Sequence, residues 1–172
     1  MIRPAGLLLA LAALALPGAA SAQSVAAPRL KARTLAQLPL PLPAPYDSAR
    51  DAAKDVDAAL ARAKKSGKPL LVDFGANWCV DCRVLAGVLE LPEMRAWVAS
   101  HFELVQVDIG AFDRNLDLPR RFGATSLEAV PAILVIDPRT RRLRNRDDIL
   151  GLGDARLLQP QQMADWLARW TR

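Results

Sequence analysis

The sequence predicts an α/β fold, a three-layer α/β/α sandwich in which helices cover both faces of a central mixed sheet. Apolar, β-branched runs of strand length alternate with segments of helical periodicity between residues 47 and 172. Hydrophobic residues make up 52% of the chain, which is enough for the core of one domain. A pair of cysteines lies where one predicted strand passes into a helix. The short helices between strands further imply right-handed crossovers.

Residues 1–22 have the pattern of a secretory signal peptide. Met1-Ile2-Arg3 is a basic start, Gly6 to Leu16 is an apolar run, and Ala20-Ser21-Ala22 is a cleavage site that would leave Gln23 as the first mature residue. An uncleaved membrane anchor is the alternative, but the apolar run is shorter than the about 20 residues that a spanning helix needs. We therefore expect a periplasmic or secreted protein, with no stable membrane insertion after the signal is removed.

Residues 23–46 are predicted to be a proline-rich linker. Proline occupies every second position from Pro39 to Pro45, which rules out a helix or a central strand and favours an extended chain. Such a segment either holds a domain away from a surface or lies along the domain with its leucines in contact. The residue pattern leaves both arrangements open.

The domain is predicted to span residues 47–172. Its first helix is expected to be capped by Asp47 or Ser48 and to run to Lys65, because an apolar helical stripe lies between these residues. A tight turn at Asp137-Pro138 makes the two strands on either side of it antiparallel. The other expected elements are a strand over residues 69–74, helices over 83–90 and 93–100, a strand over 102–109, a short helix or loop over 114–121, a strand over 131–136, a weaker edge strand over 148–152 and a closing helix over 160–170.

The two cysteines carry the strongest functional signal. Cys79 and Cys82 are the only cysteines, and an exported chain that used disulfides for stability would normally carry more. A bridge across two residues also closes too small a loop to restrain the unfolded chain. Cys79 lies at a predicted helix N-terminus, where free N–H groups and the helix dipole stabilise a thiolate. We therefore predict a redox centre in which Cys79 is the nucleophile and Cys82 resolves the mixed disulfide.

These residues resemble the thioredoxin superfamily. The stretch Asp73-Phe74-x-x-x-Trp78-Cys79-x-x-Cys82-Arg83 follows its active-site pattern, and Val130-Pro131 is similar to its cis-proline loop. The Trp-Cys-Val-Asp-Cys core also resembles the C-terminal periplasmic domain of the transmembrane thiol:disulfide interchange proteins. The similarity covers residues 51–172. It implies a thioredoxin-like fold, thiol:disulfide oxidoreductase activity and protein substrates with disulfides or thiols.

The resemblance also assigns roles around the cysteine pair. Asp73 has the spacing of the family's buried acid, which would take the proton of Cys82 through a water; an exposed aspartate at the strand end is the alternative. Val130 and Pro131 would hold an extended substrate segment by strand addition, with the bond between them cis. Trp78 would pack beside the pair and shield it, or else belong to the core.

The residues between the cysteines bear on the direction of electron flow. Val80 and Asp81 replace the Gly-Pro of ordinary thioredoxins and the Pro-His of strong periplasmic oxidants. An acidic residue weakens stabilisation of the Cys79 thiolate and makes the dithiol a better reductant. We therefore expect a reductase, isomerase or electron relay rather than an oxidase, although solvent screens an exposed aspartate. A membrane protein that donates electrons is a candidate partner.

Charge and metal-ligand patterns argue against other functions. The formal net charge is +5, and residues 139–146 include five arginines without any aromatic among them. This pattern predicts a solvated hairpin, with a docking patch for an acidic partner as the alternative, and no nucleic-acid binding. His101 and the two cysteines supply only three potential ligands, one fewer than a structural zinc site. We expect no metal and no cofactor. A non-catalytic thioredoxin-like binding module for a client or assembly partner is the alternative function.

Overall fold

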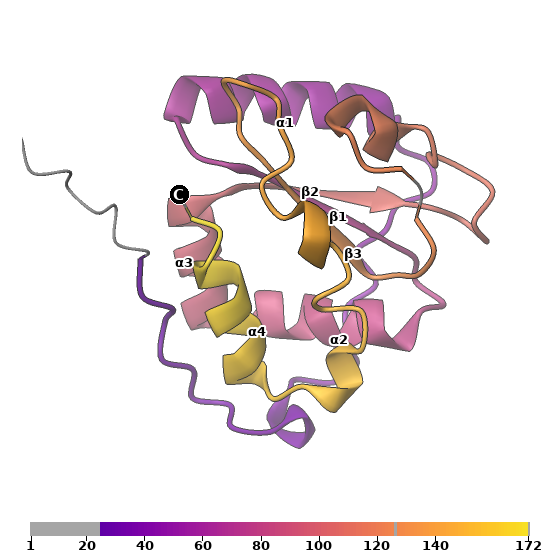
Figure 1. Cartoon of the computed structure of the whole chain (residues 1–172). Coiled ribbons are helices and arrows are strands. Elements are labelled where there is room, and N and C mark those ends of the chain that lie inside the picture. Colours follow the sequence, from indigo (N-terminus) through magenta and orange to yellow (C-terminus); the bar gives the residue numbers. More distant parts are fainter. Residues whose placement is uncertain (1–24, 126, 172) are drawn as a thin grey trace, which may run out of the picture.

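A computed structural model describes residues 25–125 and 127–171, which fold into a sheet between two layers of helices (Figure 1). The predicted signal peptide lies outside the described residues. Within the described part of the chain, no helix is both long and apolar enough to cross a membrane.

The described sheet has the strand order β2-β1-β3, with β1 (Leu70–Gly75) in the centre. β1 pairs in parallel with β2 (Glu103–Asp108) and antiparallel with β3 (Ala132–Ile136), so the predicted mixed sheet is confirmed. All six residues of β1 are buried, as expected of a strand covered on both faces. This register places Gln106 of β2 and Ile133 of β3 on either side of Asp73.

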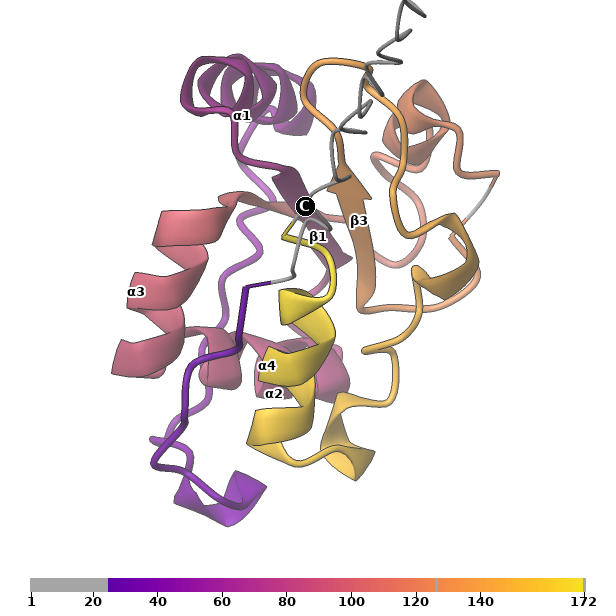
Figure 2. The same ribbon diagram turned by 60° about the vertical axis from the view of Figure 1, so that its left-hand side comes forward.

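Helices divide the core into two layers, one on each face of the sheet (Figure 2). α1 (Ala52–Ser66) packs with Leu70, Val72 and Phe74 on one face. The opposite face, which includes Leu71, is covered by the other three helices in the described residues. These are α2 (Val80–Leu89), α3 (Pro92–His101) and α4 (Pro160–Ala168). Short 3₁₀ segments are η1 (Leu35–Gln37), η2 (Leu118–Phe122), η3 (Arg146–Asp148) and η4 (Ala155–Leu157).

α1 begins later than the sequence predicted. Asp51, rather than Asp47 or Ser48, is its N-cap, and its side chain accepts a hydrogen bond from the Lys54 N–H. Asp47 instead accepts from the Ala49 N–H and closes a turn before the helix. The helix ends at Ser66, within one residue of the expected Lys65, and its C-cap Gly67 adopts a left-handed conformation with φ of 75°.

The predicted edge strand over residues 148–152 is wrong. The chain that returns along β3 makes a single β-bridge, from Leu143 to Ile136. Beyond it, the buried Asn145 side chain replaces a backbone partner: its Oδ1 accepts from the Val135 N–H at 2.8 Å, and its Nδ2 donates to the Ile133 carbonyl at 2.7 Å. The backbone supplies the other bonds of this edge, from the Ile133 N–H to the Ile149 carbonyl and from the Arg144 N–H to the Val135 carbonyl, both at 2.8 Å. The edge of β3 is thus satisfied without a continuous strand, and residues 146–148 form η3.

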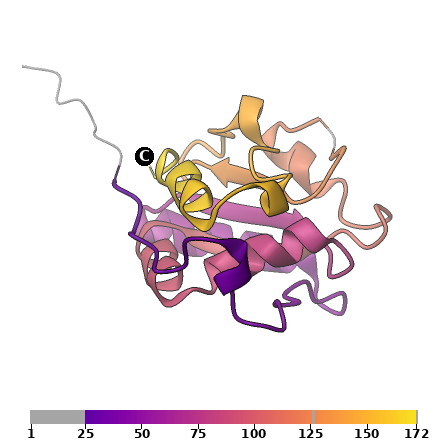
Figure 3. The same ribbon diagram turned by 90° about the horizontal axis from the view of Figure 1, so that it is seen from below.

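The proline-rich segment lies along the domain, which is one of the two arrangements left open by the sequence. We call residues 25–46 the N-terminal strap; Figure 3 shows it crossing the layer of α2, α3 and α4. Leu30 and Leu38 are buried in the core on that side. Arg83 of α2 donates to the backbone carbonyls of Leu42 and Pro43, at 2.7 and 3.1 Å. The strap is therefore part of the packed domain.

Candidate active site

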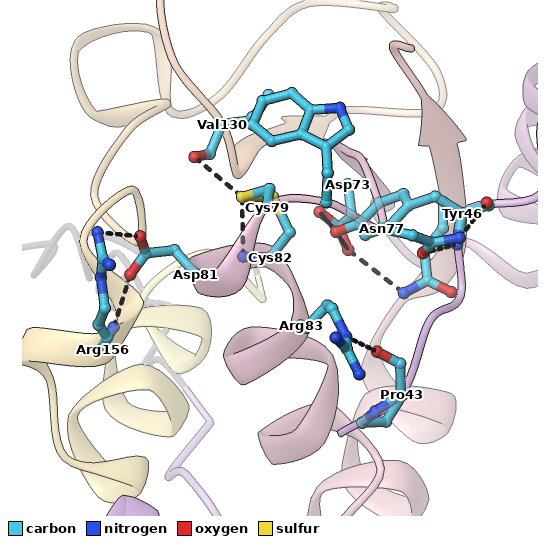
Figure 4. Close-up of a disulfide and its surroundings, with 12 residues drawn as sticks. Pro43, Tyr46, Asp73, Asn77, Cys79, Asp81, Cys82, Arg83, Val130 and Arg156 are labelled. Atoms are coloured by element: carbon cyan, nitrogen blue, oxygen red, sulfur yellow. Dashed lines mark hydrogen bonds and ion pairs between the residues drawn. A yellow bond between two sulfur atoms is a disulfide. The ribbon is translucent and has the colours of Figure 1, made fainter. Parts of the chain in front are cut away.

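Cys79 and Cys82 are joined by a disulfide at the start of α2 (Figure 4). β1 ends at Gly75, and a short turn brings the chain to Cys79, the N-cap of the helix. The Cys79 residue is 6% exposed, whereas Cys82 is fully buried. Cys79 is therefore the more exposed of the two cysteines, as predicted, and Cys82 lies further inside.

The helix N-terminus is oriented toward the Cys79 sulfur. The Cys82 N–H donates to Cys79 Sγ at 3.1 Å. The partial positive charge of a helix N-terminus stabilises an anion placed there, and a thiolate gains more from it than a neutral sulfur does. The geometry therefore favours thiolate formation at Cys79 once the disulfide is reduced.

The loop before β3 lies against the cysteine pair. The Val130 carbonyl oxygen is 3.5 Å from Cys79 Sγ, and the peptide bond between Val130 and Pro131 is cis. Val130 is half-buried and packs on the cluster of the two cysteines and Tyr46. The sequence thus identified two segments, about 50 residues apart in the chain, that meet in the structure.

Asp73 is completely buried in β1, so the alternative of an exposed aspartate is excluded. The Tyr46 hydroxyl donates to both carboxylate oxygens at 3.0 Å, and Gln106 Nε2 donates to Oδ2 at 3.3 Å. Burial raises the pKa of Asp73 to about 6, while the hydrogen bonds from Tyr46 and Gln106 oppose that rise. A carboxylate with this pKa exchanges protons near neutral pH.

Tyr46 is the site residue that the sequence analysis missed. It is 2% exposed, although it ends a segment expected to be a linker. The Asn77 side chain accepts from the Tyr46 N–H at 3.1 Å and donates to the Tyr46 carbonyl at 2.8 Å. These bonds fix the end of the strap to the turn between β1 and α2. The one available signal was compositional: Tyr46 is the only tyrosine in the chain and follows the proline run directly.

Trp78 lies at the surface, so it is not a core residue. It is 58% exposed, and its Nε1 donates to the Gly110 carbonyl at 2.7 Å. Its ring centroid lies 6.1 Å from that of Phe112, which is also exposed. Together with the exposed Val80, these rings form an apolar surface beside the cysteine pair.

Asp81 is buried, contrary to the expectation of an exposed residue. Its Oδ1 accepts from the Arg156 N–H at 2.9 Å, and its Oδ2 lies 3.1 Å from the Arg156 guanidinium. This ion pair connects α2 to η4 and gives the carboxylate a cation of its own. The sequence could not show it because 75 residues separate the partners.

The basic run and His101 lie in ordinary structural surroundings. Arg139, Arg141 and Arg142 are exposed in the turn after β3, as expected of a solvated hairpin. Arg144 pairs with Asp137 at 2.6 Å. His101 ends α3, where its Nδ1 lies 2.7 Å from the Trp97 carbonyl oxygen.

Similarity to known proteins agrees with this geometry. The thioredoxin-like family model matches residues 51–138, about half of the chain. The solved structure of a disulphide isomerase from Xylella fastidiosa is 39% identical, with a TM-score of 0.70, and the similarity covers 76% of this chain and 99% of that one.

Shorter matches reach curated proteins. The thiol:disulfide interchange protein DsbD 1 of Pseudomonas aeruginosa is 42% identical over 55 residues, covering 31% of this chain and 9% of that protein. A thioredoxin of Rickettsia bellii is 35% identical over 66 residues, covering 38% of this chain and 58% of its own length. The family match, the structural similarity and the observed fold lead to one conclusion. The chain belongs to the thioredoxin-like family.

Proposed function

We propose that the protein is a thiol:disulfide oxidoreductase that exchanges two electrons with the cysteines of other proteins. The observation that carries the proposal is the Cys79–Cys82 disulfide at a helix N-terminus, with the sulfur of the more exposed cysteine beside the Val130 carbonyl. The names of the similar proteins, a disulphide isomerase and a thiol:disulfide interchange protein, describe the same class of chemistry.

The reaction follows from the positions of the two sulfurs. In the reduced protein, the Cys79 thiolate attacks a disulfide of the client, and one client sulfur leaves as a thiolate. Cys82 then loses its proton to Asp73 by way of a water and attacks Cys79 Sγ. The mixed disulfide breaks, the second client thiolate leaves, and the Cys79–Cys82 disulfide forms. The client gains two electrons and the protein loses two; the reverse sequence oxidises a client dithiol.

Two surfaces beside the pair would hold the client. The backbone of Val130, next to the cis bond to Pro131, can pair with an extended client segment as an added strand. The apolar surface of Trp78, Val80 and Phe112 would cover the side chains of that segment. Both surfaces are generic, which suits an enzyme that accepts several proteins.

We further propose that the protein is exported, with residues 1–22 removed as a signal peptide. Residues 47–172 would form the thioredoxin-like domain, with the packed strap of residues 25–46 preceding it. Asp81 in the first turn of α2 supports a reducing role, because a negative charge near Cys79 disfavours its thiolate. A membrane protein that supplies electrons would then regenerate the dithiol.

Insulin reduction in the presence of dithiothreitol tests the activity. Cys79→Ser should abolish turnover, and Cys82→Ser should accumulate a mixed disulfide with the client, because only the resolving step is lost. Wild-type turnover in Cys79→Ser would refute the assignment of the nucleophile. No turnover in the wild-type protein would favour a binding module instead.

A further inference from the structure

The strap places the Tyr46 hydroxyl group against the Asp73 carboxylate, which is completely buried. Tyr46 donates to both oxygens of Asp73 at 3.0 Å, and its ring packs in the same cluster as Cys79 and Cys82. In Figure 4, the Tyr46 side chain reaches Asp73 from the strap side, opposite the ion pair of Asp81. Tyr46 therefore contacts both the proposed base and the sulfur pair.

Contacts from several elements fix the position of this tyrosine. Asn77 holds its backbone with two hydrogen bonds, and Arg83 holds the strap just before it. Gly75 provides the space for the ring, since a Cβ at this position would overlap the Tyr46 side chain. A residue held from three directions is preorganised rather than incidental.

We propose that Tyr46 is a positioning residue for the redox reaction: its hydroxyl holds the Asp73 carboxylate in the orientation and charge state that accept the proton of Cys82. The inference rests on the proposed oxidoreductase function. It gives the strap a role in chemistry, because the strap places beside Asp73 a group that residues 47–172 do not supply.

The chemistry assigns a distinct task to each group. Asp73 takes the proton from Cys82 as Cys82 Sγ attacks Cys79 Sγ, the client thiolate leaves with the bonding electron pair, and Asp73 later passes its proton to solvent. Tyr46 stays protonated throughout. Burial and the neighbouring Asp73 charge hold the pKa of Tyr46 far above its usual range, so it acts only as a donor.

The hydrogen bond favours the ionised form of Asp73. Tyr46 from the strap and Gln106 from β2 are the side chains that donate hydrogen bonds to Asp73, and β3 pairs the apolar Ile133 with it. The cysteine pair of α2 packs in one cluster with Tyr46. Burial raises the pKa of Asp73 and the hydrogen bond from Tyr46 lowers it, so removal of the Tyr46 hydroxyl should raise this pKa further. More of the carboxylate is then protonated and unable to act as a base.

The test separates the two chemical steps with 5,5′-dithiobis(2-nitrobenzoate) and the reduced full chain. The first thionitrobenzoate released reports attack by Cys79, and the second reports attack by Cys82 on the mixed disulfide. The variants are Tyr46→Phe, Asp73→Asn and the double variant. Thr171→Val is the matched control, because it removes another buried hydroxyl, which donates to the Ala168 carbonyl.

We expect Tyr46→Phe to slow only the second release. Loss of one hydrogen bond to a buried carboxylate changes its proton affinity by about tenfold, so the second release should slow about fivefold at pH 6, about twofold at pH 7 and negligibly at pH 8. In the Asp73→Asn background, Tyr46→Phe should have no further effect. The ¹³C carboxyl titration of Asp73 in the oxidised protein should move upward by about one pH unit without any turnover.

Other outcomes overturn the inference. Equal slowing of both releases, or the same slowing in the Asp73→Asn background, would mean that Tyr46 acts only by packing. An unchanged carboxyl titration in Tyr46→Phe would also refute it. If the wild-type protein released no second thionitrobenzoate, the proposed function itself would fail. If the wild-type protein and Tyr46→Phe released the second thionitrobenzoate at the same rate, the function would stand and only the role of Tyr46 would be refuted.

Discussion

Two buried carboxylates flank the cysteine pair, and they are satisfied in different ways. Asp73 lies in the sheet, where only the neutral groups of Tyr46 and Gln106 donate to it. Within the described residues, no Lys, Arg or His pairs with it. Asp81 lies on α2 and has both a cation and a backbone N–H from Arg156. One carboxylate is buried without a countercharge, and the other belongs to an ion pair.

This difference indicates what each carboxylate can do. A buried charge with only neutral donors is costly, so its pKa rises and it can exchange a proton in the working pH range. A carboxylate held by arginine is instead suited to a fixed charge that ties two segments together. We infer that Asp73 serves the chemistry, whereas Asp81 serves the geometry and the local field.

The largest expected difference between them is in turnover. Asp73→Asn removes the proposed base, and general base catalysis contributes about 100-fold or more, part of which water can replace. We expect insulin reduction at pH 7 to fall at least about tenfold, compared with less than about twofold for Asp81→Asn. Equal losses in the two variants would mean that the two carboxylates contribute alike to turnover.

Stability should change in the opposite sense. Keeping Asp73 ionised at pH 7 costs the folded state about 3 kcal/mol, given the rise of its pKa from 3.8 to about 6. Asp73→Asn should therefore raise the free energy of unfolding of the oxidised protein by about 2 kcal/mol, since the amide loses part of the gain. Asp81→Asn should lower the free energy of unfolding by only about 1 kcal/mol, because Arg156 is exposed and solvent weakens its ion pair with Asp81. Urea denaturation measures both values.

The pH dependence of stability sharpens this comparison. The folded state binds the Asp73 proton more tightly than the unfolded state, so protonation of Asp73 favours folding below pH 3.8, and that advantage is lost as the pH rises to about 6. The stability gain of Asp73→Asn over the wild-type protein should be absent at low pH, grow across this window and stay constant above it. A gain of the same size at all pH values would show that charge is not its cause.

Local patterns in the sequence predicted most of the fold. The apolar run of β1, the helical stripe of α4 and the cap-like position of Cys79 depend on neighbouring residues, and all three are confirmed. The meeting of Val130 with Cys79 was predictable only from the resemblance, because no local pattern encodes it.

Long-range partnerships account for what was missed. Tyr46 and Asp73 are 27 residues apart, and Asp81 and Arg156 are 75 residues apart, so neither pair produces a recognisable local pattern in the sequence. The edge strand beside β3 was mispredicted because the Asn145 side chain supplies two of the hydrogen bonds at this edge, where a strand would supply them from its backbone. Such contacts depend on the folded chain, where one side chain can satisfy groups of a distant element.

The smallest expected effect concerns the redox potential, and it tests the field of Asp81 directly. A negative charge beside Cys79 disfavours the thiolate and makes the dithiol more reducing, while Arg156 offsets that field. Asp81→Asn should therefore raise the potential by about 10 mV, and Arg156→Ala should lower it by a similar amount, with both shifts smaller in high salt. Equilibration with glutathione measures these values, and Asp165→Asn, a neutralisation on the exposed side of α4, is the control. Shifts of the same sign in Asp81→Asn and Arg156→Ala would mean that the pair acts by holding α2 in place, since charge effects must have opposite signs.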